Sequence, residues 1–112
     1  MKNTPEGKIK RKVVEVLKRQ HVWYFFPAAN GFGRAGIPDI IAIVAGVFVG
    51  IECKADVKKK PTVLQVKCGE EIVAAGGKWE LVRCQEDVDK LESLVEEIRN
   101  NAGSRHCESA ST

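Results

Sequence analysis

The stretch GIPDIIAIVAGVFVGIECK, residues 36–54, reads as two apolar β-strands joined at Ala45-Gly46. A two-residue loop there, or a four-residue loop with the same centre, pairs residues whose numbers sum to 91. That register sets Asp39 opposite Glu52, and Lys54 shares their face because side chains repeat every second residue. A three-residue loop would shift the register by one and move Asp39 to the other face.

Two interpretations of these three charges are open. Opposed carboxylates repel each other, but a hard divalent cation such as Mg²⁺ or Mn²⁺ turns them into ligands. Lys54 could then orient or deprotonate an attacking water, or stabilise charge on a reacting phosphate. Alternatively, Asp39 is a turn residue, and Glu52 and Lys54 form the solvated side of an edge strand. The shared face and the basic surroundings favour a site.

Capping and turn signals divide the rest of the chain into further elements. These are a helix from Thr4-Pro5-Glu6, a short strand within residues 21–26, a helix between the capping box Thr62-x-x-Gln65 and Gly76-Gly77, a strand in residues 78–84, and a helix from Gln85 or Glu86. Glycines at 31, 33 and 36 predict a mobile loop that carries Arg34. The predicted order is αβββαβα.

The length of 112 residues and the hydrophobic content of 44% suit one domain with a modest core. We expect this domain to cover residues 1–100 and the polar residues 101–112 to form a flexible tail. A signal peptide or membrane-spanning run is not recognisable, so we expect a soluble, cytoplasmic protein. The four cysteines lie far apart without a Cys-x-x-Cys pair, which argues against zinc and indicates reduced thiols.

Charge is distributed unevenly along the chain. Residues 1–67 hold 13 Lys and Arg against 5 Asp and Glu, whereas residues 68–112 hold 5 against 10. A basic half suits a polyanion such as nucleic acid, although a solvated helix face explains the basic residues of the first helix equally well. The candidate phosphate contacts are Lys8, Lys10, Arg11, Lys12, Arg34, Lys58, Lys59 and Lys60.

The first helix carries two acids on opposite sides. Glu6 shares a face with Ile9, Val13 and Leu17, while Glu15 points to solvent. An acid on the core-facing stripe can reach the sheet below it, although a favourable helix-dipole charge also explains Glu6. Gly7 follows Glu6 where helix propensity favours almost any other residue, so we expect a loose first turn.

Residues 36–77, GIPDIIAIVAGVFVGIECKADVKKKPTVLQVKCGEEIVAAGG, resemble the VRR-NUC family of PD-(D/E)XK nucleases, and the resemblance extends over roughly residues 4–100. It implies an α/β, restriction-endonuclease-like αβββαβ core with a mixed central sheet flanked by helices. It also implies that Asp39, Glu52 and the backbone carbonyl of Cys53 bind Mg²⁺ or Mn²⁺, and that Lys54 and Gln65 are catalytic. The acid of the first helix is carried by Glu6, a further candidate catalytic residue and metal ligand.

The resemblance implies a metal-dependent DNA endonuclease. Small stand-alone members of the family, commonly from viruses and bacteria, resemble junction-resolving enzymes that act as homodimers. We therefore expect structure-selective cleavage of branched, Holliday-junction-like DNA by a homodimer, in a bacterial or virus-infected cell. The alternatives are a nicking or nonspecific nuclease without junction preference, and a non-catalytic module that binds nucleic acid.

Overall fold

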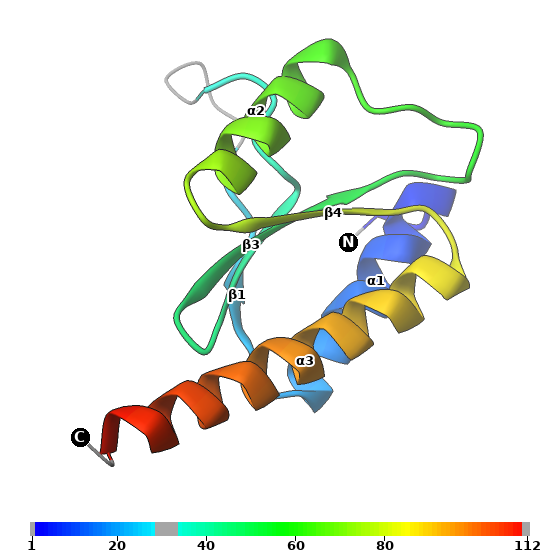
Figure 1. The fold of residues 1–112 in the computed structure, drawn as a ribbon. Helices are drawn as coiled ribbons and strands as arrows, with labels where there is room; N and C mark the ends of the chain where they lie inside the picture. Colours follow the sequence, from blue (N-terminus) through cyan, green and yellow to red (C-terminus); the bar gives the residue numbers. More distant parts are fainter. Residues whose placement is uncertain (1, 29–33, 111–112) are drawn as a thin grey trace.

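The computed structural model describes residues 2–28 and 34–110, with side chains up to residue 103. Its elements are α1 (Pro5–Arg19), β1 (Trp23–Phe25), β2 (Ile40–Val44), β3 (Val47–Cys53), α2 (Val63–Ala74), β4 (Lys78–Val82) and α3 (Gln85–Ala110). The order αβββαβα is confirmed. The strands form one sheet in the order β1-β2-β3-β4, antiparallel except for the parallel pair β3 and β4, which confirms the predicted mixed sheet (Figure 1).

The hairpin between β2 and β3 turns on two residues. Ala45 (φ 47°) and Gly46 (φ 82°) both have the positive φ that a type I′ loop requires. Ile40 pairs with Ile51, and every pair up to the turn keeps the same sum, so the predicted register is confirmed. One step beyond the last pair, Asp39 lies opposite Glu52.

The hydrophobic core lies between one face of the sheet and the helices α1 and α3, which run side by side (Figure 1). Alternate residues of β2 and β3 point into it, while the helices contribute residues three and four apart. The core residues of these four elements are Ile9, Val13, Val14, Val16, Leu17, Ile40, Ala42, Val44, Val49, Ile51, Cys53, Val88, Leu91, Val95 and Ile98. The even-numbered residues of β3, Glu52 among them, therefore face away from this core.

The helix α2 covers part of the opposite face (Figure 1). Only Cys68 and Gly69 of this helix are buried. A Cβ atom at Gly69 would overlap the Trp79 indole ring of β4, so glycine is what allows α2 to lie this close to the sheet. This close packing fixes the distance between the first turn of α2 and the face of β3.

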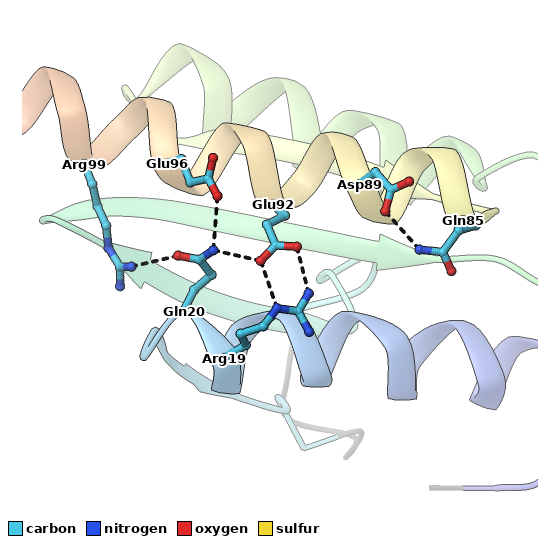
Figure 2. A network of polar contacts seen from close by, with 7 residues as sticks. All are labelled: Arg19, Gln20, Gln85, Asp89, Glu92, Glu96 and Arg99. Atoms are coloured by element: carbon cyan, nitrogen blue, oxygen red, sulfur yellow. Dashed lines mark hydrogen bonds and ion pairs between the residues drawn. The ribbon is translucent and has the colours of Figure 1, made fainter.

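Polar contacts join the end of α1 to α3 (Figure 2). The Arg19 guanidinium donates to both carboxylate oxygens of Glu92 (2.7 and 3.1 Å), and the Gln20 amide donates to Glu92 (2.7 Å) and to Glu96 (3.3 Å). Arg99 donates in turn to the Gln20 amide oxygen (3.2 Å). This network orients α1, which carries Glu6 and Lys10 at its other end.

Two segments differ from the sequence expectation or fall outside the structure. The helix α3 continues to Ala110, past residue 101 at which the sequence predicted the start of the tail; Gly103 is the one strong helix breaker between residues 101 and 110, and proline is absent there. Gly31 and Gly33 of the predicted mobile loop lie outside the described residues. Within the described ranges, no helix combines the length and apolar character needed to cross a lipid bilayer.

Candidate functional site

Asp39 and Glu52 meet where β2 begins and β3 ends. Glu52 is 1% exposed, and the Asp39 side chain is 24% exposed. The backbone N–H of Cys53 donates to Asp39 Oδ2 (2.9 Å), which holds the aspartate across the hairpin. The carboxyl groups therefore lie on the same side of the sheet and close enough to interact with each other.

The two oxygens of Glu52 have different surroundings. Oε1 accepts a hydrogen bond from the Gln65 amide nitrogen (3.1 Å), whereas the buried Oε2 has no hydrogen-bond donor. A buried carboxylate oxygen without a partner is costly, and such an exception in a folded protein calls for a specific explanation. A cation between Asp39 and Glu52 would satisfy Oε2.

The environment of Glu52 opposes its ionisation. Burial raises the pKa of Glu52 to about 8, the adjacent carboxyl group of Asp39 adds to the rise, and the charge of Lys54 partly offsets it. Near neutral pH the carboxyl group therefore keeps a proton unless a positive charge replaces it. This is the behaviour expected of a cation-binding carboxylate in the absence of the cation.

Gln65 has two roles at once. Its backbone N–H donates to Thr62 Oγ1 (3.2 Å) and its Oε1 accepts from the Thr62 N–H (2.8 Å), which confirms the capping box. The same side chain donates from Nε2 to Glu52. The helix cap thus fixes the amide that orients Glu52. The sequence indicated only the cap, because the contact with Glu52 depends on how α2 packs against the sheet.

Lys54 follows the end of β3 and is partly buried. Its backbone N–H donates to the Val82 carbonyl of β4 (3.0 Å), which continues the parallel pairing past the last strand residue. Its ammonium group is close enough to Glu52 to lower the pKa of that carboxyl. Asp39, Glu52, Lys54 and Gln65 are therefore brought together in space.

Cys53 contributes only its backbone to this side of the sheet. Its side chain is fully buried in the core on the opposite face, where burial, together with the charge of Asp39, raises the pKa of the thiol. A protonated thiol in an apolar core is a poor metal ligand. Of the groups of Cys53, the carbonyl remains as the candidate ligand.

Lys10, expected from the sequence to contact phosphate, lies inside the acidic site. Its ammonium group is 3.6 Å from Asp39 Oδ1 and 3.4 Å from Glu6 Oε2, and the side chain is only 25% exposed. Burial lowers the pKa of Lys10, but Asp39 and Glu6 outweigh this and raise it. The Glu6-to-Lys10 spacing of four residues was the sequence signal for this pair, and the contact with Asp39 required the structure.

The first turn of α1 is well formed, contrary to the expectation from Gly7. Thr4 caps the helix by accepting a hydrogen bond from the Gly7 N–H (3.0 Å). A Cβ atom at position 7 would overlap the Lys2 carbonyl, so glycine permits a close approach of the preceding chain. Glu6 is thereby held at the rim, where its side chain is 43% exposed and paired with Lys10.

The other basic candidates fall into two groups. Lys8, Lys12 and the run Lys58 to Lys60 are exposed. Arg11 instead contacts Lys2 and Asn3, and Arg34 pairs with Glu71 of α2 (3.1 Å). The exposed lysines belong to α1, which also carries Lys10, and to the loop between Lys54 and α2.

The donor set fits Mg²⁺ or Mn²⁺. Carboxylate and carbonyl oxygens are the hard ligands these ions prefer, and the unpartnered Glu52 Oε2 provides an open position. Within the described part of the chain, no three His, Cys, Asp or Glu side chains converge in an arrangement that could hold a metal. The site therefore offers two carboxylates, Asp39 and Glu52, and a bound ion would complete its coordination with the Cys53 carbonyl and water.

Comparisons with known proteins bear on this arrangement. Neither a protein-family model nor a curated protein matches the chain. A solved structure described as a VRR_NUC domain matches with a TM-score of 0.70 and 28% sequence identity, over 79% of this chain and 94% of that one. The strand order, the juxtaposed Asp39 and Glu52, and this structural likeness support the resemblance of the chain to the VRR-NUC family and a nuclease-type domain.

Proposed function

We propose that this protein is a Mg²⁺- or Mn²⁺-dependent endonuclease that hydrolyses phosphodiester bonds in DNA. The observation that carries the proposal is the buried, unpartnered Glu52 Oε2 beside Asp39, with Lys54 and Gln65 at the same place. Neutral residues in place of Asp39 and Glu52 would give a more stable fold, and binding of a cation explains why two acids stand there instead.

Asp39, Glu52 and the Cys53 carbonyl would hold the metal. When bound, Mg²⁺ or Mn²⁺ supplies Lewis-acid polarisation of a phosphate oxygen. The Gln65 amide keeps Glu52 in place through its bond to Oε1. Lys54, beside Glu52, would either orient the attacking water or, as the neutral amine, take a proton from it; as the ammonium ion it would stabilise negative charge on the phosphate.

The surroundings of the site support DNA as the substrate. Exposed lysines at positions 8, 12 and 58–60 present positive charge on α1 and on the loop between β3 and α2. Lysines of this kind contact the phosphate backbone and carry no base sequence information. This supports selection of DNA by its structure, and we propose branched, Holliday-junction-like DNA as the preferred substrate.

We propose further that the protein acts as a homodimer. Trp23, Ile43 and Phe48 pair across β1, β2 and β3 and form one row of apolar side chains, 61%, 43% and 39% exposed. Exposed apolar surface of this kind marks association sites. A second copy on this surface would bring two active sites to one branched substrate, as paired cuts require.

Cleavage of matched substrates tests the proposal. Wild type and Glu52→Gln are incubated with a four-way junction, a flap and a linear duplex, each with Mg²⁺, Mn²⁺ or EDTA. We expect the wild type to cut the junction fastest and only with metal, and Glu52→Gln to lose at least about a hundredfold in rate. The exposed Glu15 provides the control Glu15→Gln, which removes the same charge far from the site and should cut like wild type.

Each outcome of this experiment leads to a different conclusion. Equal cutting by wild type and Glu52→Gln would refute the proposed chemistry. Equal cutting of junction and duplex would leave a nuclease without junction preference. Tight DNA binding by the wild type without cleavage in either metal would identify a non-catalytic binding module.

A further inference from the structure

The four carboxylate oxygens of Asp39 and Glu52 are not equally available to a metal. Asp39 Oδ2 is bonded to the Cys53 N–H, and Glu52 Oε1 is bonded to Gln65. Glu52 Oε2 has no donor, and Asp39 Oδ1 faces the Lys10 ammonium at 3.6 Å. The oxygens that accept no N–H bond are therefore Oε2, which is open to a shared dication, and Oδ1, which Lys10 already neutralises.

Lys10 is held in this position from two directions. Glu6, one helical turn earlier, lies 3.4 Å from its ammonium group, and the cap at Thr4 fixes the turn that carries Glu6. A hollow of about 410 Å³ is lined by Glu6, Lys10 and Phe26, among others, and Asp39 is not part of its lining. The ammonium group can therefore leave Asp39, move toward this hollow and keep its contact with Glu6.

We propose that Lys10 is a positioning residue, a built-in counterion that neutralises Asp39 until a divalent cation displaces it and so sets the affinity of the site for that cation. The inference rests on the proposed function, because it takes Asp39 and Glu52 as metal ligands. Two positive charges on Oδ1 repel each other, so metal binding must open the ion pair between Lys10 and Asp39. Glu6 retains the lysine nearby, ready to return when the metal leaves.

Direct measurement of metal affinity tests this role without relying on cleavage. Binding of Mn²⁺ to the full chain in the absence of DNA is followed by electron paramagnetic resonance for wild type, Lys10→Met and Lys18→Met. Lys18 is an exposed lysine near the other end of α1, so its replacement controls for the loss of one positive charge. We expect Lys10→Met to bind Mn²⁺ about tenfold more tightly than wild type and Lys18→Met to match wild type.

The direction of the change separates this role from a structural one. Damage to the fold would weaken Mn²⁺ binding, whereas removal of a competing cation strengthens it. Unchanged or weaker affinity in Lys10→Met would overturn the inference and return Lys10 to the DNA contact that the sequence suggested. Lys10→Gln, which keeps a polar side chain, provides the same measurement if the methionine variant does not fold.

Asp39→Asn distinguishes failure of this inference from failure of the proposed function. If Asp39→Asn abolishes Mn²⁺ binding and Lys10→Met leaves it unchanged, the metal site stands and the role of Lys10 is wrong. If neither wild type nor Lys10→Met binds Mn²⁺, the proposed metal site is refuted, and the proposed role of Lys10 is refuted with it.

Discussion

The buried carboxyl of Glu52 should destabilise the metal-free protein as the pH rises. Its pKa is raised to about 8 by burial and by Asp39, against an ordinary value of 4.5. A carboxyl with a raised pKa in the folded state holds its proton more tightly there than in the unfolded chain. The stability it contributes is therefore fully present below pH 4.5 and is lost as the pH rises toward 8.

The size of the effect follows from this change in pKa. Moving a pKa from 4.5 to about 8 corresponds to about 5 kcal/mol. Because Asp39 is partly exposed and paired with Lys10, its charge is screened, and we expect the measured loss to be about 2–3 kcal/mol. Glu52→Gln keeps the shape and the acceptor for Gln65 but cannot ionise, so this part of the pH dependence should disappear.

Urea unfolding at pH 5, 6, 7 and 8 in EDTA measures the difference. Wild type should lose about 2–3 kcal/mol relative to Glu52→Gln over this range. Burial also raises the pKa of Glu80, so the difference between the two proteins, rather than the slope of either, isolates Glu52. Parallel curves for wild type and Glu52→Gln would refute the claim that Glu52 is held in an unfavourable environment for its charge.

Three further predictions concern the scaffold around the site. Ala45 has a positive φ that asparagine tolerates better, so Ala45→Asn should stabilise the protein by about 0.5–1 kcal/mol in urea unfolding, and a loss of stability would contradict the type I′ turn. Gly69→Ala should destabilise by about 2 kcal/mol or more by pushing α2 away from Trp79, and an unchanged melting temperature would contradict the close packing. Replacement of Ile43 by Glu should leave the core intact but halve the mass measured by light scattering, and a mass equal to that of wild type would contradict the dimer surface.

The sequence was sufficient for the framework of the site. Ala45-Gly46 can form only a few hairpin loops, and the two-residue form fixes the register that sets Asp39 opposite Glu52. The N-cap at Thr4 and the capping box at Thr62 and Gln65 are local signals, and both helices begin where these signals predict. Local chemistry therefore determines the positions of the acids.

Contacts between distant elements could not be predicted in this way. The Gln65 bond to Glu52 depends on the height of α2 above the sheet, which Gly69 and Trp79 set. Lys10 reaches Asp39 because the core fixes the rotation of α1, and an amphipathic pattern specifies the buried face but not the partner of a residue at its edge. The continuation of α3 past residue 100 was not predicted, because the polar composition of residues 101–110 indicates contact with solvent and does not show where a helix ends.

Anomalous diffraction from crystals grown with Mn²⁺ tests whether Asp39 and Glu52 jointly hold a metal. We predict one strong peak per chain, within coordination distance of Glu52 Oε2, an oxygen of Asp39 and the Cys53 carbonyl, with Lys10 moved away from Asp39. A peak bound to only one of the two acids, or no peak at this place in a crystal that contains Mn²⁺ elsewhere, would contradict the proposed site.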